Sequence, residues 1–168
     1  MIADALRLML FPTLMAFAAS SDLLTMTISN RVSLILAAGF FGLAAAGGMG
    51  GFDMLMHLGA GAAVLVAGFI CFARGWMGGG DAKLAAATAL WFGFNHLFDY
   101  LIYASLFGGA LTILLLQYRM LPLPRFLANQ QWAARLHEKE CGVPYGIALA
   151  AAGLCVYPET AFMKMIGL

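Results

Sequence analysis

Two aspartates stand at positions where a carboxylate could do chemistry. Asp22 closes an apolar run near the N-terminus, and Asp81 opens another apolar run directly after three consecutive glycines. An acid that borders or enters a membrane helix is costly, so such a residue is a candidate for function. Two carboxylates brought close together cannot both ionise easily, and one keeps a proton while the other loses it. The ionised acid can then take a proton from water while the neutral acid protonates a leaving amine, which hydrolyses a peptide bond without a metal.

The glycines before Asp81 predict an unusual backbone at that acid. Gly78 and Gly80 allow positive φ angles and close chain approach, so we expect Asp81 to sit on an unwound turn that faces a water-filled cavity. The carboxylate would also lie near a helix N-terminus, where the helix dipole favours its ionised form. Each acid has a plainer interpretation: Asp22 as a helix-end acid that caps the next loop, and Asp81 as a helix N-cap. Because a close pair titrates together, the sequence leaves open which aspartate is the base and which the acid.

The composition is that of a chain that lies mostly within a membrane. Of its 168 residues, 63% are apolar and 10% are charged, and the mean hydropathy is +0.90. Soluble domains carry about 25% charged residues, so a soluble globular domain is excluded. The formal net charge of +1 gives no reason to expect nucleic acid as a partner. Because a spanning helix needs about 20 apolar residues, we expect one all-α domain over residues 1–168, a polytopic bundle of about six transmembrane helices near 3–21, 32–49, 54–73, 82–98, 100–118 and 143–163.

The lysines and arginines predict how these spans are oriented. The loops on the cytoplasmic side of a membrane collect more basic residues than those on the other side. Of the nine lysines and arginines, only Arg7 and Lys164 lie on one side of the expected bundle. We therefore expect both termini to face outward, and Asp22, Asp81 and the long loop 119–141 to face the cytoplasm. The other seven basic residues, all on that expected cytoplasmic side, are Arg31, Arg74, Lys83, Arg119, Arg125, Arg135 and Lys139.

The long loop contains a segment with helical character. We expect residues 129–140 to form a short amphipathic helix, with Trp132 and Leu136 on one side, that lies on the cytoplasmic membrane surface. A plain basic connector is the alternative. The basic loops are also expected to meet anionic membrane lipids.

No metal site and no cofactor are expected from the sequence. The three cysteines include no CxxC pair, which argues against a zinc knuckle or a redox pair. The histidines, which are His57, His96 and His137, are scattered between the two sides of the expected bundle and do not form a ligand set.

Three blocks of the sequence resemble the type IV prepilin peptidases, a family of membrane aspartyl proteases with a G-x-G-D motif. The segment GGGDAKL at residues 78–84 is similar to the family's G-x-G-D-x-K-L block. Asp22, followed by ISN at residues 28–30, resembles its first motif, with Ser29 where the common pattern has proline. The segment VPYGIA at residues 143–148 resembles its final-helix block. The three blocks together extend over most of the chain.

The resemblance implies an intramembrane aspartyl endopeptidase in which Asp22 and Asp81 activate water. Its substrates would be prepilins and pseudopilins, which carry a short basic leader and an apolar helix. Cleavage would occur at the cytoplasmic face of the bacterial inner membrane, usually just after a glycine. The residues that the resemblance implies as supporting or substrate-positioning are Gly78, Gly80, Lys83, Asn30 and Tyr145.

Some members of that family carry paired CxxC motifs and an N-methyltransferase activity. The sequence contains no CxxC motif, so methylation is not expected. In this respect the chain resembles the short CpaA/TadV-type peptidases of tight-adherence (Flp) pilus systems.

Three other functions stay open at the level of the sequence. The same pair of acids could act on preflagellins or on helical signal peptides. A small proton-coupled transporter or channel subunit could use Asp22 and Asp81 as proton relays, although such relays are expected in mid-span. A non-catalytic assembly subunit would tolerate the loss of both acids. The pilin substrate and the oligomeric state are also left open.

Overall fold

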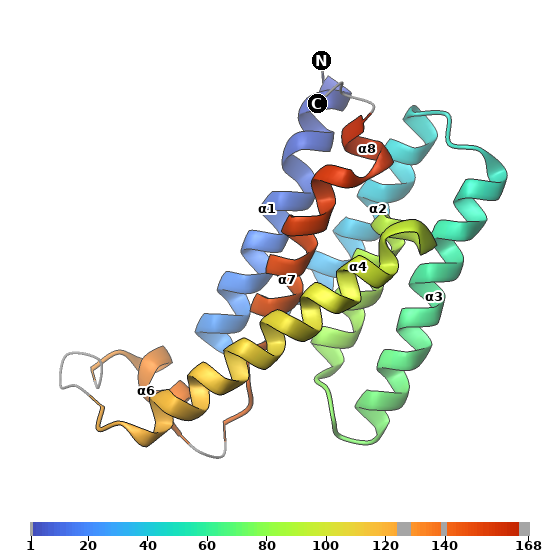
Figure 1. Ribbon diagram of the computed structural model, residues 1–168. Coiled ribbons are helices and arrows are strands. Elements are labelled where there is room, and N and C mark those ends of the chain that lie inside the picture. The colour runs from blue at the N-terminus through green and yellow to red at the C-terminus, as the bar shows by residue number, and fades with distance from the viewer. Residues whose placement is uncertain (1, 124–128, 139–140, 165–168) are drawn as a thin grey trace.

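The computed structural model describes residues 2–123, 129–138 and 141–164, and every regular element in these ranges is a helix (Figure 1). An all-α architecture is thereby confirmed. The long helices are α1 (Ile2–Thr25), α2 (Asn30–Ala46), α3 (Gly51–Ala73) and α4 (Gly79–Met120). The short elements are α6 (Gln131–His137), α7 (Tyr145–Val156), the 3₁₀ turn η1 (Tyr157–Glu159) and α8 (Ala161–Lys164).

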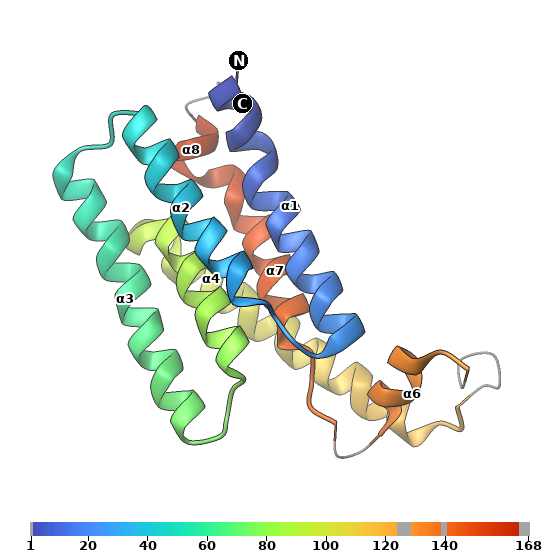
Figure 2. The ribbon, with the colours of Figure 1, turned by 180° about the vertical axis from the view of Figure 1, so that it is seen from behind.

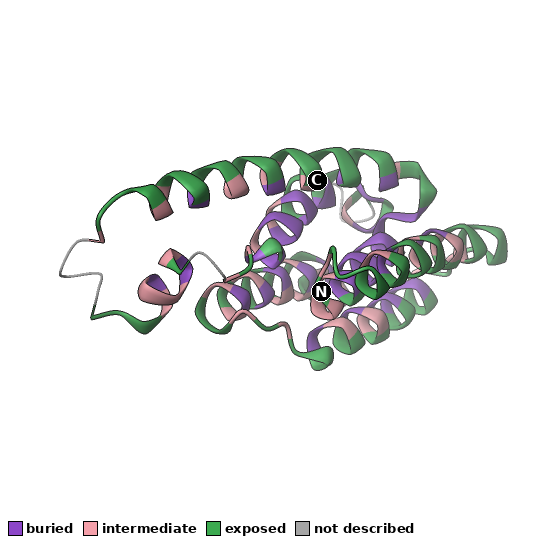
Figure 3. Ribbon diagram, turned by 90° about the horizontal axis from the view of Figure 1, so that it is seen from below, coloured by how far each residue is buried: buried purple, intermediate pink, exposed green. Residues whose placement is uncertain are grey.

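The surface of the bundle is that of a membrane protein. By length and composition α1, α3 and α4 can each cross a membrane, and α2 is a shorter apolar helix. Large apolar side chains on these helices point away from the protein, and Leu34, Phe69 and Phe98 are 67%, 65% and 74% exposed. Figure 3 shows exposed residues along the outward faces of the helices and buried residues between them. Apolar faces of this extent suit lipid rather than water, so the chain is a polytopic membrane protein.

The fourth and fifth expected spans form a single element, α4, which reverses direction at Gly93. This residue has φ 58° and ψ −173°, a conformation that glycine adopts and other residues avoid. Figure 1 shows the chain turning back there, so that residues 79–92 (the first arm) and residues 94–120 (the second arm) run in different directions. The expected junction between residues 98 and 100 is therefore wrong. A charged residue, Asp99, suggested that boundary, whereas the backbone freedom of Gly93 decides it.

His57 of α3 packs against the turn in α4. Nδ1 of His57 lies 2.8 Å from the carbonyl oxygen of Leu90, in the last turn of the first arm. A Cβ placed on Gly93 would lie 3.1 Å from three atoms of the His57 ring. The His57 ring therefore fills the space beside Gly93, and its hydrogen bond joins α3 to the last turn of the first arm.

The last expected span, residues 143–163, is not a continuous helix. Helix α7 has 12 residues, which at 1.5 Å per residue is about 18 Å, short of the ~30 Å hydrocarbon core. Pro158 lies in the turn η1 that follows. Because proline lacks the amide hydrogen that helix propagation needs, the helix ends before it and the chain resumes as α8.

The core centres on Trp91 of the first arm, which is fully buried. Its indole nitrogen donates a hydrogen bond of 3.0 Å to the carbonyl oxygen of Leu36 in α2. The rings of Phe11, Phe40 and Phe162 lie 5.3, 6.2 and 5.1 Å from it. These contacts join α1, α2, α4 and α8, so one aromatic cluster holds the bundle together.

The segment after α4 folds back on the second arm. Helix α6 lies within the expected helical segment 129–140, of which Lys139 and Glu140 are outside the described residues. Arg119 donates hydrogen bonds to the carbonyl oxygens of Leu136, Cys141 and Gly142 at 2.8 to 2.9 Å. This one guanidinium therefore fixes the path from α6 to α7.

Candidate active site

The two candidate acids lie at the same end of the bundle. Figures 1 and 2 both show the last turn of α1 and the first turns of α2, α4 and α7 at that end. We call it the aspartate end, because Asp22 lies in the last turns of α1 and Asp81 in the first turn of α4. The start of α1, the α2–α3 turn and α8 lie at the opposite end (Figure 2).

Asp22 is held by the N-terminus of a helix far away in sequence. Its Oδ2 accepts a hydrogen bond of 2.7 Å from the backbone nitrogen of Gly146, in the first turn of α7. The side chain is buried, with 5% of the residue exposed. A helix N-terminus carries unpaired amide hydrogens and a positive dipole end, and both favour an anionic carboxylate. The plainer interpretation of Asp22 as a cap for its own loop does not describe this contact, because the amide belongs to α7.

The close approach of α7 to Asp22 depends on a glycine. A Cβ placed on Gly146 would lie 2.8 Å from Oδ2 of Asp22 and 2.7 Å from Cδ1 of Ile28. Any larger side chain would push α7 away and lengthen the hydrogen bond. Gly146 is therefore a candidate site residue that the sequence analysis did not name. The signal was present in the segment VPYGIA, but the role was assigned to its neighbour Tyr145.

Asp81 is held by its own helix. It lies three residues after Gly78, the N-cap of α4, and its carboxylate accepts a hydrogen bond from the Gly78 backbone. An acid at this position reaches back to the N-cap amide as in a capping box. The interpretation of Asp81 as the N-cap itself is therefore corrected.

Gly78 matters for Asp81 because it leaves room for the carboxylate, and not because its dihedral angles are unusual. Gly78 has φ −69° and ψ 143°, which any residue can adopt. The expected unwound turn with positive φ is thus absent at Gly78, and Asp81 stands on regular helix. A Cβ on Gly78 would, however, lie 2.9 Å from Oδ2 of Asp81. Because Gly78 has no side chain, the carboxylate of Asp81 has room to lie against the backbone there.

Gly80 brings the two acids' segments together. A Cβ on Gly80 would lie 3.2 Å from Cβ of Ile28 and 3.5 Å from its backbone nitrogen. Ile28 belongs to the loop after Asp22, and its side chain also touches the Gly146 position. Asp22 and Asp81 lie close enough for the charge of one to act on the other. The first turn of α4, the loop after α1 and the first turn of α7 therefore meet around Ile28.

No described lysine or arginine forms an ion pair with either aspartate. Each carboxylate is instead held by a backbone amide, and each is at least partly withdrawn from solvent. Two acids in that situation relieve their repulsion by sharing a proton. This arrangement suits a pair in which one acid is charged and the other neutral.

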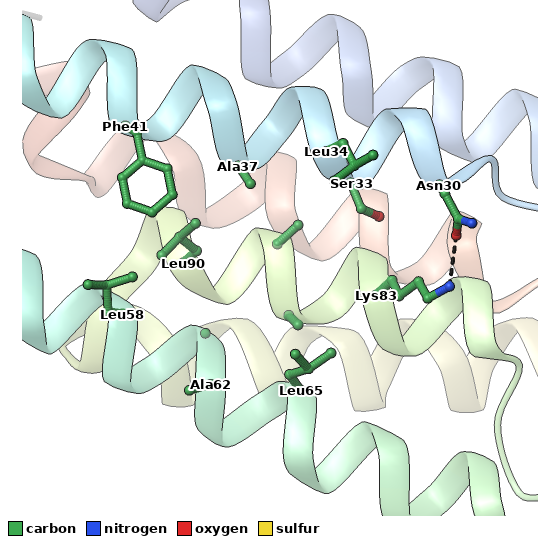
Figure 4. A pocket seen from close by; sticks show the side chains of 13 residues that line it. Asn30, Ser33, Leu34, Ala37, Phe41, Leu58, Ala62, Leu65, Lys83 and Leu90 are labelled. Carbon is green, nitrogen blue, oxygen red and sulfur yellow. Dashed lines mark hydrogen bonds between the residues drawn. The ribbon is translucent and has the colours of Figure 1, made fainter.

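Two predicted supporting residues contact each other rather than the aspartates. Nζ of Lys83 donates a hydrogen bond of 2.9 Å to Oδ1 of Asn30, the first residue of α2 (Figure 4). Both side chains are exposed. The bond joins the start of α2 to the second turn of α4, close to Asp81. Their contribution in the structure is to position these two helices.

Tyr145 faces the second arm of α4. Its hydroxyl lies 3.2 Å from the Thr112 hydroxyl, and its ring lies 3.2 Å from the position of a Cβ on Gly108. These contacts dock α7 against α4. Tyr145 therefore helps to position α7, in which the amide of the next residue, Gly146, binds Asp22.

Two apolar grooves begin near the aspartate end. One, of about 590 Å³, lies between α2, α3 and the first arm, with Lys83 and Asn30 at one end and Phe41 and Leu58 at the other (Figure 4). The other, of about 480 Å³, lies between α3, both arms of α4 and α7. Met77 and Tyr145 line it, together with Ala85, one helical turn after Asp81.

Neither aspartate belongs to a metal-type cluster within the described residues. The described side chains that approach one another closely enough to share an ion are His96, Asp99 and Glu159, at the opposite end.

The sequence matches the model of a known protein family. The family model for the type IV leader peptidase family matches residues 9–113, which include Asp22, Asn30, Asp81 and Lys83. No curated protein and no solved structure gives a significant match. The matched region covers more than half of the chain, and the chain belongs to the type IV leader peptidase family, whose members are peptidases.

Proposed function

We propose that the protein is an intramembrane aspartyl endopeptidase that removes the short basic leader from type IV prepilins of the Flp type. Its catalytic residues are Asp22 and Asp81. The observation that carries the proposal is the meeting of two acids from separate helices, each bound by a backbone amide, with no described cation paired to either.

The pair can hydrolyse a peptide bond in two steps. The ionised aspartate takes a proton from a water molecule as the water oxygen bonds to the scissile carbonyl carbon, while the neutral aspartate hydrogen-bonds the carbonyl oxygen. The neutral aspartate then gives its proton to the amide nitrogen, the C–N bond breaks, and the amine leaves. The pair again holds one proton, now on the aspartate that took it from water, so the reaction consumes one water and needs no cofactor.

The grooves suit a substrate that is itself an apolar helix. A prepilin has its leader outside the hydrocarbon and its hydrophobic helix within it. An apolar helix lying along α4 in the groove that Ala85 and Met77 line would present its N-terminal end next to Asp81. The scissile bond, between leader and helix, would then reach the acids without leaving the membrane interface.

The distribution of basic residues supports a cytoplasmic active site. Arg31, Arg74 and Lys83 lie in or beside loops at the aspartate end, whereas Arg7 and Lys164 lie at the opposite end. Under the positive-inside rule the aspartate end faces the cytoplasm of the bacterial inner membrane and both termini face outward.

The test is co-expression of the chain with a candidate Flp-type prepilin, followed by gel shift and mass spectrometry of the pilin. Wild type is expected to remove the leader. Asp22→Asn and Asp81→Asn are expected to leave it in place, because each change removes the ionisable group with little change in shape. Asp53→Asn, an exposed acid in the first turn of α3 at the opposite end, is the matched control and should cleave normally.

Each other outcome has a defined meaning. Cleavage by either aspartate variant would show that the paired-acid mechanism is wrong. Failure of wild type on several prepilins, with cleavage of a preflagellin or another signal peptide, would assign a different substrate to the same acids. If wild type cleaves no leader at all, a proton-relay or assembly role replaces the peptidase.

A further inference from the structure

A second cluster of chemically active side chains lies at the opposite end of the bundle. His96 and Asp99 stand on the second arm of α4, just after the turn at Gly93, and Glu159 stands on η1. One ligand atom from each of the three lies within 4.8 Å of the other two. Elements about 60 residues apart in sequence thus meet at this point, an arrangement that only the tertiary fold produces.

The groups in this cluster have few contacts of their own, and His96 and Asp99 form an ion pair only when His96 is protonated. Nδ1 of His96 is buried without a hydrogen-bond partner, and Oδ2 of Asp99 lies 3.7 Å from it, too far for a hydrogen bond. Among the described residues, no lysine or arginine forms an ion pair with Asp99 or Glu159. A buried ring nitrogen left unpaired and two neighbouring carboxylates are each unfavourable. A cation placed between them would satisfy all three groups.

We propose that His96, Asp99 and Glu159 bind a divalent transition-metal ion of the Zn²⁺ class. One imidazole nitrogen with two carboxylate oxygens suits such an ion, whereas Ca²⁺ and Mg²⁺ prefer oxygen ligands alone. An ion bound tetrahedrally at about 2.1 Å holds its ligand atoms roughly 3.4 Å apart. Asp99 and Glu159 are exposed, so rotation of their side chains closes the remaining gap of about an ångström. Water completes the coordination.

One cation opposes this binding. Lys164 at the end of α8 and His96 line the same small pocket of about 150 Å³. The positive charge of Lys164 lowers the affinity of the cluster for a divalent cation, and this effect weakens as the salt concentration rises. Removal of this charge, in Lys164→Gln, is therefore expected to strengthen metal binding.

The bound ion would join η1 to the second arm of α4. Helix α7 leads directly into η1, and its other end carries the amide that binds Asp22. The ion would thus stabilise the bundle at the end remote from the candidate active site. It takes no part in cleavage, so this proposal stands apart from the proposed function.

The test measures metal binding directly. The full chain in detergent micelles is stripped with EDTA and then titrated with Zn²⁺ against a chromophoric chelator. Wild type is expected to bind one Zn²⁺ per chain, and His96→Ala and Glu159→Gln to bind it roughly tenfold more weakly or worse. Asp53→Asn and His137→Ala, an acid and a histidine outside the cluster, are the matched controls and should bind as wild type does.

Thermal unfolding supplies the second readout. Zn²⁺ is expected to raise the unfolding midpoint of wild type and of Lys164→Gln, and to leave that of Glu159→Gln unchanged. The gain from Lys164→Gln cannot result from misfolding, so it tests the site even where a ligand variant folds poorly. Equal Zn²⁺ affinity in all variants, or no bound ion in wild type and Lys164→Gln, would overturn the proposal.

Discussion

At the scale of single residues, the two candidate acids are positioned by different means. Asp81 takes its hydrogen bond from Gly78, three residues before it, so its place is decided within one turn of helix. Asp22 takes its hydrogen bond from Gly146, which is 124 residues away. The geometry of the pair therefore depends on how closely α7 docks against α1. Gly146 is the residue that permits this contact.

Gly146→Ala is expected to lower leader cleavage at least tenfold, equivalent to about 1.4 kcal/mol of transition-state stabilisation. The added methyl group would lie 2.8 Å from Oδ2 of Asp22, so α7 must shift and the hydrogen bond must lengthen. The measurement is the initial rate of cleavage of a prepilin in micelles.

Gly142→Ala is the matched control for this change. Its added Cβ would meet only a methyl group of Met26, at an ordinary 3.7 Å, so the rate should stay within about twofold of wild type. Equal rates for the two alanine variants would mean that the amide of Gly146 does not position Asp22.

At the scale of elements, α4 decides the architecture. Its two arms supply the acid Asp81, the central Trp91 and, after the turn, the surface on which Tyr145 docks. The turn rests on Gly93, whose dihedral angles lie in a region that is open almost only to glycine. The His57 ring occupies the space next to it. A side chain at this position has neither a permitted conformation nor room.

Gly93→Ala is therefore expected to destabilise the protein by about 1–3 kcal/mol. The control is Gly109→Ala in the second arm of the same helix, where a Cβ would have no neighbour within 4 Å. Alanine favours a helix over glycine by about 1 kcal/mol, so this variant should be as stable as wild type or more so. Thermal unfolding in micelles, followed by circular dichroism, measures both. If Gly93→Ala unfolds at the wild-type temperature, the helix does not turn at residue 93.

At the scale of the whole molecule, the two groups of candidate functional side chains lie at opposite ends of the bundle. The aspartate end carries the two acids, the Lys83–Asn30 bond and the Arg119 contacts that fix the approach to α7. The opposite end carries the start of α1, helix α8 and the cluster of His96, Asp99 and Glu159. Leader cleavage in the cytoplasm requires that the first of these ends face inward.

This orientation predicts a labelling pattern for single cysteines in a variant whose native cysteines are replaced by serine. Asn129→Cys should react with a membrane-impermeant maleimide in inside-out vesicles, and Gly50→Cys in right-side-out vesicles. Both positions are exposed, and they lie at the aspartate end and the opposite end respectively. The cysteine-free parent must still cleave a prepilin. A reversed labelling pattern would place the acids outside and contradict cleavage in the cytoplasm.

The residue types determined the class of this protein and its candidate acids before any fold was considered. Long uncharged runs lead to a helical membrane bundle because lipid offers no partners for backbone amides. Asp22 and Asp81 attract attention because charge is rare and costly beside such runs. The break in α4 was harder to place, since Gly93 is one of 20 glycines and its neighbours show no charge or proline.

Only the tertiary structure decided what holds the candidate acids in place. The bond from Gly146 to Asp22, the contact of Gly80 with Ile28 and the pairing of Lys83 with Asn30 all join elements that are distant in sequence. Hydropathy and spacing describe one element at a time, so they do not register which backbone amide faces which carboxylate. That depends on how closely helices pack, and here the packing distance is set by glycines whose missing side chains leave no trace in a hydropathy pattern.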